Sequence, residues 1–278
     1  MGGSVGGATH QIQTMNKTTT SVVLCAALSL GALINPALAA DPVTAPAAVP
    51  LTLTTTAVSQ YMFRGVRLGG LCFQPSVEAA LGDGALGVWS SLPLASKVDG
   101  VSDPEFDIYG SYSFKLSDAA SLVPGFTWYL YPNADEAIGF YQSTFEPSLA
   151  LNYTLGDFKI TPKVYYDLVL SGPTAEVTAA VSLPLKDAGT SLDFAATVGT
   201  YKWTDAAAET NPALKNWGDY WQVGVSSPYQ VSKDAKLVVG YAYTQGTGNY
   251  YKQGTDPKSE NSAAVGRGVV TLSYSVSF

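Results

Sequence analysis

Apolar and polar residues alternate along most of the chain after residue 50. In 158–170, one face carries Phe158, Ile160, Val164, Tyr166, Leu168 and Leu170, and the other carries Lys159, Thr161, Lys163, Tyr165 and Asp167. Period-two alternation is the pattern of a β-strand with one apolar and one polar face. We therefore predict twelve strands, at 51–64, 71–82, 84–92, 104–116, 120–131, 140–155, 158–170, 174–183, 191–202, 217–231, 235–246 and 264–278.

The connections between these segments alternate in length. Short ones are rich in Gly and Asp, which tolerate tight turns: Gly82-Asp83-Gly84, Ser117-Asp118-Ala119, Gly156-Asp157, Lys186-Asp187-Ala188-Gly189 and Lys233-Asp234-Ala235. The others, except the brief 171–173, are longer and polar: 65–70, 93–103, 132–139, 203–216 and 247–263. Short turns at one end and long loops at the other are typical of outer-membrane barrels. The pattern predicts an all-β chain, with 51–278 forming a single transmembrane antiparallel up-and-down β-barrel of about 12 strands.

A soluble periplasmic β-sandwich has the same alternation, with its apolar faces turned inward. Composition favours the inverted arrangement, because charged residues are only 13% of the chain and soluble domains carry about 25%. Tyr and Trp also lie near predicted strand ends, among them Tyr61, Trp128 and Trp217, as in the aromatic girdles of membrane barrels. Two features do not fit this arrangement. Pro75, Pro124, Pro147 and Pro162 fall within predicted strands although proline cannot donate a backbone hydrogen bond, and segment 84–92 has no clear apolar face.

The N-terminal region has the features of a secretory signal. Lys17 precedes an apolar run at 22–33, and Ala37-Leu38-Ala39 offers a small-residue cleavage site. The run is shorter than the ~20 apolar residues that span a bilayer. We predict an upstream extension and signal peptide at 1–39, with a start at Met15, and a Pro-rich periplasmic lead-in at 40–50. The predicted mature chain then keeps Cys72 alone, without a disulfide partner, and loses His10, the only histidine.

The chain ends in an alternating stretch with an aromatic terminus. Phe278, Val276, Tyr274 and Leu272 fall on one face, with Ser residues between them. This ending resembles the C-terminal signal by which the barrel assembly machinery recognises outer-membrane barrels. We predict that these four residues form that assembly signal, and that the chain is exported to the outer membrane of a Gram-negative bacterium.

A second resemblance lies in residues 58–91. The stretches are Val58-Ser59-Gln60-Tyr61-Met62-Phe63-Arg64-Gly65, then Gln74-Pro75-Ser76-Val77-Glu78, then Gly87-Val88-Trp89-Ser90-Ser91. They resemble the opening of the TorF-type porin family, which has a Tyr-x-Phe-Arg-Gly element, a Pro-containing segment and a Gly-x-Trp stretch. Leu71-Cys72-Phe73 departs from the small polar residues expected there. The resemblance implies an outer-membrane barrel and a channel.

The predicted lumen faces carry charges of both signs. By the alternation, the inward charged residues are Arg64, Glu78, Glu105, Asp107, Lys115, Glu146, Lys159, Lys163, Asp167, Glu176, Asp193 and Arg267. Such a lumen can orient polar solutes at a constriction, or its charges can pair and fill it. Barrels of about eight strands are filled with side chains and those of about sixteen hold a channel. Twelve lie between, so a narrow pore and a plugged lumen both stay open.

Two sets of these charges stand out. Arg64 closes the family-like element, either as a functional charge or as a rim arginine paired with an acid such as Glu78. Lys163 and Asp167 lie on one strand face, either as half of a constriction or as a satisfied pair.

The function that these features favour is a channel for small hydrophilic solutes. The alternatives are a non-conducting structural or adhesive barrel with a plugged lumen, and a barrel lipid hydrolase. Loss of the histidine removes the usual general base, so we expect no enzyme, and we expect no cofactor and no metal site. A net charge of −7 disfavours a nucleic-acid partner. The expected partners are outer-membrane lipid, the assembly machinery and the solutes.

Overall fold

A computed structural model describes residues 49–97, 103–134, 141–169, 171–202, 217–246 and 267–278. Most of these residues belong to β-strands. The strands of the main sheet are β1 (Leu51–Val58), β4 (Cys72–Leu81), β5 (Gly84–Pro93), β6 (Glu105–Tyr112), β7 (Phe114–Lys115), β8 (Ala120–Leu130), β9 (Ser143–Leu155), β10 (Phe158–Asp167), β11 (Gly172–Leu185), β12 (Thr190–Lys202), β13 (Trp217–Gln230), β14 (Ala235–Gly246) and β15 (Arg267–Ser277). A short 3₁₀ turn, Lys186–Ala188, joins β11 to β12.

The sheet closes on itself to form a barrel. Every pairing in the main sheet is antiparallel. Most strands pair with their neighbours along the chain, and β1 pairs with both β4 and the last strand, β15. The pairing of β6 with β8 completes the ring, and β7 continues β6 beyond Ser113. The fold is therefore a closed antiparallel barrel of 12 strands, which confirms the predicted fold class.

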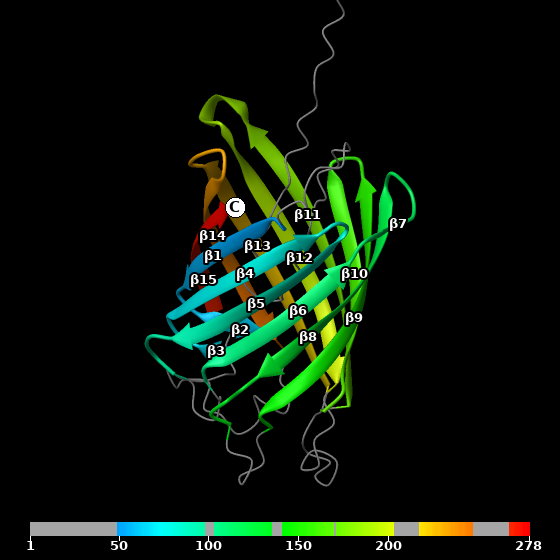
Figure 1. Cartoon of the computed structure of the whole chain (residues 1–278), viewed down its shortest axis with the longest axis vertical. Helices are drawn as coiled ribbons and strands as arrows, with labels where there is room; N and C mark the ends of the chain where they lie inside the picture. Colours follow the sequence, from blue (N-terminus) through cyan, green and yellow to red (C-terminus); the bar gives the residue numbers. More distant parts are fainter. Residues whose placement is uncertain (1–48, 98–102, 135–140, 170, 203–216, 247–266) are drawn as a thin grey trace, which may run out of the picture.

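The start of β1 and the end of β15 lie side by side at one rim of the barrel. The N–H of Phe278 donates to the carbonyl of Leu51 over 2.8 Å, and the N–H of Leu51 donates back over 3.3 Å. The short turns, such as those after β4 and β9, lie at this same rim, at the top of Figure 1, and the other ends of these strands lie at the opposite rim. We call the rim with the short turns the turn rim and the opposite one the loop rim.

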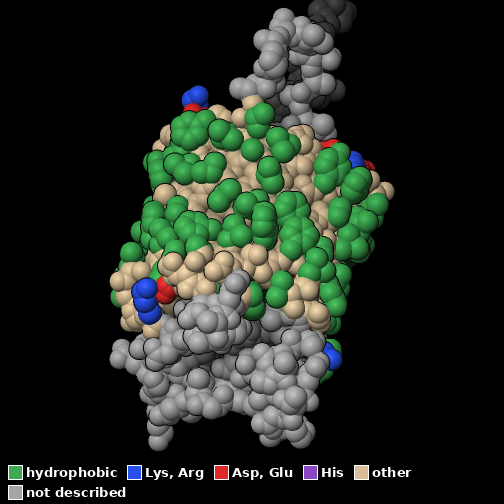
Figure 2. Space-filling model, turned by 60° about the horizontal axis from the view of Figure 1, so that its bottom comes forward, with side chains coloured by type: hydrophobic (Ala, Val, Ile, Leu, Met, Phe, Trp, Pro, Cys, Tyr) green, Lys and Arg blue, Asp and Glu red, His purple; other side chains and the backbone are tan. Residues whose placement is uncertain are grey.

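The apolar faces of the strands point outward, away from the lumen. Phe145, Val164 and Leu272 are 37%, 52% and 50% exposed, so the apolar residues do not converge on a dry interior as in a sandwich. Hydrophobic side chains cover the outer wall in Figure 2, and the charged side chains visible there lie near its two ends. Among the described residues, none belongs to a helix long and apolar enough to cross a membrane.

The four in-strand prolines are accommodated without a bulge. Pro75 and Pro162 lie where the pairing with one neighbour is interrupted, and the same register resumes beyond them. Pro124 and Pro147 keep their places in the β8–β9 pairing. A proline lacks one N–H donor, so the loss stays local when the rest of the ladder continues.

Strand 84–92 does have two faces. Val88 is exposed on the outer wall, whereas Gly87 faces the lumen. A Cβ on Gly87 would lie 2.4 Å from Cζ of Tyr109, so the ring from β6 fills the place that a side chain of β5 would take. The face was hidden in the sequence because glycine carries no polarity signal.

The predicted first strand, 51–64, was too long. β1 ends at Val58, and a separate two-stranded hairpin follows, made of β2 (Tyr61–Phe63) and β3 (Val66–Gly69). We call Tyr61–Gly69 the inner hairpin. It lies within the outline of the barrel near the loop rim (Figure 1) and shares no sheet with the wall. The predicted signal peptide and most of the predicted lead-in lie outside the described residues.

Candidate functional site

The inner hairpin turns on two residues, Arg64 and Gly65. Phe63 pairs with Val66, so the loop has only these two residues, and their φ angles are +48° and +73°. Two positive φ angles define the type I′ turn, whose first position is usually Asn, Asp or Gly. An arginine there costs about 1–2 kcal/mol of backbone strain. This strain implies that contacts of the Arg64 side chain hold the turn in place.

Apolar contacts anchor the base of the inner hairpin inside the barrel. Tyr61 and Met62 pack with Val58, Cys72 and Val269, which lie on β1, β4 and β15, and all five residues are buried. Tyr61 was expected in an aromatic girdle, but its side chain points inward and its ring lies 5.8 Å from that of Trp89. The cluster fixes the hairpin to one side of the wall.

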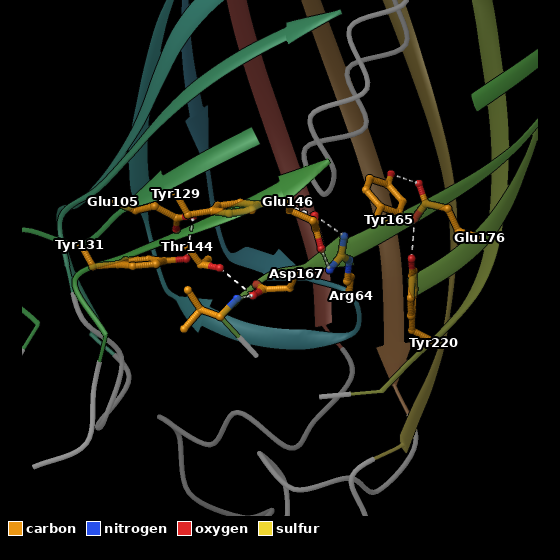
Figure 3. Close-up of polar contacts among 11 residues, drawn as sticks. Arg64, Glu105, Tyr129, Tyr131, Thr144, Glu146, Tyr165, Asp167, Glu176 and Tyr220 are labelled. Carbon is orange, nitrogen blue, oxygen red and sulfur yellow. Dashed lines mark hydrogen bonds and ion pairs between the residues drawn. The ribbon is translucent and has the colours of Figure 1, made fainter. Parts of the chain in front are cut away.

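The tip of the inner hairpin is held on a different part of the wall. Arg64 Nη1 and Nη2 donate to Oε1 and Oε2 of Glu146 on β9, each over 2.8 Å (Figure 3). The guanidinium also lies 4.6 Å from the ring centroid of Phe63 and 4.7 Å from that of Tyr165. Arg64 is only 3% exposed, so it is not a rim residue. The suggested partner Glu78 accepts a hydrogen bond from Tyr109 over 3.0 Å.

Gly65 places the tip against a third part of the wall. A Cβ on Gly65 would lie 2.6 Å from the backbone N and Cα of Gly246 on β14. The inner hairpin therefore starts at β1, reaches β9 through Arg64 and touches β14 through Gly65. In a closed barrel these contacts place a segment of chain across the lumen.

A methyl group at Gly65 should push the tip off the wall. We expect Gly65→Ala to displace the hairpin, because its Cβ would overlap the Gly246 backbone. Gly82→Ala is the matched control: Gly82 also has a positive φ, +65°, but nothing lies within 4 Å of its Cβ position. Limited proteolysis in detergent should cut Gly65→Ala, and not Gly82→Ala, within residues 59–70. Equal protection of both variants would contradict the contact.

Around the tip, tyrosine hydroxyls hold the lumen carboxylates. Tyr129 donates to Glu146 over 3.0 Å, and Tyr165 and Tyr220 both donate to Glu176 (Figure 3). Tyr61 donates to Glu105 over 2.9 Å. These groups, from the hairpin and six wall strands, belong to what we call the lumen belt: Tyr61, Arg64, Glu105, Asp107, Tyr129, Glu146, Tyr165, Asp167, Glu176 and Tyr220.

The remaining predicted lumen residues lie in several places. Asp167 accepts hydrogen bonds from Thr144 Oγ1 over 2.6 Å and from the N–H of Val169. Lys163 Nζ lies 4.4 Å from the Tyr165 ring centroid, so Lys163 and Asp167 are held by different groups. Lys159 and Arg267 are partly buried in β10 and β15.

Two predicted residues lie toward the turn rim. Asp193 accepts hydrogen bonds from Ser182 and Ser191 near the turn between β11 and β12. Lys115 is 73% exposed and pairs with Asp118 over 2.7 Å, so it lies outside the lumen belt. This hydrogen bond and charge lower the pKa of Asp118 in its turn. The prediction misplaced Lys115 because alternation gives the face of a residue but not its depth along the strand.

Sequence reasoning missed the tyrosines and one arginine of this region. Tyr165 was placed on the polar face of its strand, and that position was the available signal for a lumen role. Arg67 is 2% exposed, and its Nε donates to Gln60 Oε1 over 2.6 Å. It lay in a segment interpreted as a loop. Among the described residues, no group of three or more His, Cys, Asp and Glu is placed to hold a metal ion.

Comparison with known proteins gives a family match over most of the chain. The model of the family described as "Bacterial protein of unknown function (Gcw_chp)" matches residues 39–276. The chain belongs to this family. The TorF-type label is not part of that description and stays a prediction. No curated protein matches the chain.

Solved structures with a similar chain course are outer-membrane proteins. The KdgM porin is 12% identical with a TM-score of 0.49, and the match covers 82% of this chain and 99% of that one. The KdgM porin in complex with disordered oligogalacturonate is 11% identical, with a TM-score of 0.47 and coverage of 83% and 99%. OprD from Pseudomonas aeruginosa is 12% identical, with a TM-score of 0.38 and coverage of 82% and 65%.

Proposed function

We propose that this protein is an outer-membrane channel for small hydrophilic solutes, with the inner hairpin as its constriction. The observation that carries the proposal is the hairpin held across a polar lumen by the Arg64–Glu146 pair. Solutes would pass beside the hairpin or after its tip moves. The lumen belt would supply the hydrogen-bonding groups and charges that select them.

The inner wall supports passage of polar solutes on the turn-rim side of the hairpin. Hydroxyl groups from neighbouring strands meet there, as in Thr56 with Ser273 at 2.8 Å and Thr178 with Thr197 at 2.8 Å. Asn152 and Thr161 face the same space, linked over 3.1 Å. These inward groups hydrogen-bond water well, whereas the outer wall carries Leu, Val, Phe and Trp. A hydrated interior inside an apolar wall is the arrangement of a membrane channel.

Conductance across a planar lipid bilayer tests the channel directly. Purified, folded protein should produce discrete current steps, and heat-denatured protein should produce none. Folded protein is recognised by its faster migration on a gel before boiling. Folded protein that inserts in the bilayer and stays silent would contradict the proposal.

A plugged, non-conducting barrel is the second candidate, and the burial of the lumen belt favours it. Met62, Asp107 and Glu146 are 0%, 0% and 1% exposed, so bulk water does not reach them in this conformation. The two candidates differ in what happens on removal of the hairpin. A channel conducts with and without it, whereas a plugged barrel conducts only after the hairpin is removed.

If the outer wall faces lipid, the destabilisation caused by an outward-facing arginine should depend on its depth in the bilayer. Val223, at the middle of β13, and Val231, at the turn rim, are 48% and 59% exposed. Arginine on a lipid-facing wall costs about 2–4 kcal/mol at the bilayer midplane and about 0–1 near the interface. Val223→Arg should therefore lower the free energy of unfolding in liposomes strongly, and Val231→Arg should barely change it. Equal, small effects would indicate a wall that faces water.

A further inference from the structure

The lumen belt carries more buried negative than positive charge. The buried acidic residues of the belt are Glu105, Asp107, Glu146, Asp167 and Glu176, and its buried basic residue is Arg64. Buried charges in proteins are paired or neutralised. Arg64 is committed to Glu146 by both terminal nitrogens. The other carboxylates of the belt must therefore be balanced by further positive charge or by bound protons.

Asp107 is the belt carboxylate with the fewest compensating groups around it. Its side chain is 0% exposed on the lumen face of β6, and neither carboxylate oxygen accepts a hydrogen bond from an N–H or hydroxyl group of the described residues, so its polar neighbour is the Glu105 carboxyl. Glu176 differs, because the hydroxyls of Tyr165 and Tyr220 donate to its two oxygens. Leaving a buried carboxylate without donors costs free energy, so the Asp107 oxygens are available to a positively charged ligand.

The surroundings of Asp107 complete a site of oxygen ligands. Glu105 lies two residues away on the same strand face, and it is 5% exposed. Its Oε2 accepts a hydrogen bond from Tyr61 over 2.9 Å and its Oε1 one from Tyr131 over 3.4 Å, which fixes the carboxylate beside Asp107. Carboxylate and hydroxyl oxygens are the ligands of hard cations.

We propose that Asp107 and Glu105 form a binding site for a small inorganic cation, which makes the channel cation-selective. The selectivity rests on the proposed channel function, but occupancy of the site does not. A cation there balances the carboxylates of the belt. Anions entering the lumen meet the same excess negative charge and are repelled.

Reversal potentials in a KCl gradient test the selectivity. The natural protein should prefer K⁺ to Cl⁻. In Asp107→Asn the ratio of K⁺ to Cl⁻ permeability should fall about fivefold, the factor that one unit charge at contact distance contributes in water. Asp193→Asn is the matched control, since it removes one buried carboxylate that lies near the turn between β11 and β12, outside the lumen belt. It should change the ratio much less. Equal losses in both variants, or a natural protein without cation preference, would overturn the site.

Occupancy is measured separately, in crystals of the natural protein soaked in RbCl. An anomalous-scattering peak between Asp107 and Glu105, absent from Asp107→Asn crystals, is the expected result. Lack of a peak in the natural protein would overturn the site and would indicate that the two carboxyls share a proton. A silent bilayer together with an occupied site would instead refute the channel and leave the cation site standing.

Discussion

Replacing residues 60–70 with a short Gly-Ser linker should raise the single-channel conductance severalfold. The linker is feasible because Val58 of β1 and Cys72 of β4 are direct pairing partners, so the wall strands need only a tight turn between them. The replacement removes Tyr61, Met62 and Arg64, which fill the lumen from the cluster at its base to Glu146. Pore conductance rises with the cross-section that water and ions can occupy, so the widened lumen should carry more current.

The matched control changes a connection at the turn rim. Replacing the 3₁₀ turn Lys186–Ala188 with Gly-Ser alters a connection that lies outside the lumen and contains no buried residue. Its conductance should match that of the natural protein. Conductance that is unchanged after removal of the hairpin would show that the hairpin does not occlude the permeation path.

Replacing either Arg64 or Glu146 alone should destabilise the position of the inner hairpin in the lumen more than replacing both residues together. Both side chains are almost fully buried, at 2% and 1% exposure. Removing one partner of a buried ion pair costs about 3–5 kcal/mol, because the other charge is left without compensation. Arg64→Met and Glu146→Gln should each release the tip, and each variant should show frequent switching to a higher conductance. The double variant should switch less often than either single one, since it leaves no uncompensated charge.

The control for this experiment is a solvent-exposed ion pair of the same protein. Lys115 and Asp118 pair at the turn rim with 73% and 99% exposure, and exposed pairs contribute little to stability. Lys115→Ala should leave both the switching and the urea midpoint of unfolding unchanged. Additive effects of the two single substitutions in the double variant would contradict coupling between Arg64 and Glu146.

The barrel itself was predictable from the sequence for a geometric reason. Side chains alternate between the two faces of a strand, so each of the twelve segments except 84–92 shows in its own sequence which face is polar and which is apolar. The predicted ends of most strands agree with the structure within a few residues, as for β10 at Phe158–Asp167 against 158–170. The inward set of β9 and β10, including Glu146, Lys163 and Asp167, follows from the same alternation.

The lumen belt was predictable only in part. The alternation placed Glu105, Asp107, Glu146 and Glu176 on inward faces, but it did not say which groups satisfy them. The tyrosine partners come from other strands: Glu176 of β11 receives hydroxyls from β10 and β13. The choice among such partners depends on the register and stagger of the closed sheet, which neighbouring residues in the sequence do not record.

By itself, the sequence determined the strand count, the inward and outward faces of all segments but 84–92, and the alternation of short turns with longer connections, because these follow from local alternation and turn chemistry. Only the tertiary structure decided the course of residues 59–71, of which 59–64 had been predicted as part of the first strand. Their apolar residues find partners on three wall strands, and Arg64 finds its carboxylate 82 positions away on β9. Long-range burial and charge pairing thus outweighed the local strand pattern, and they placed the inner hairpin in the lumen.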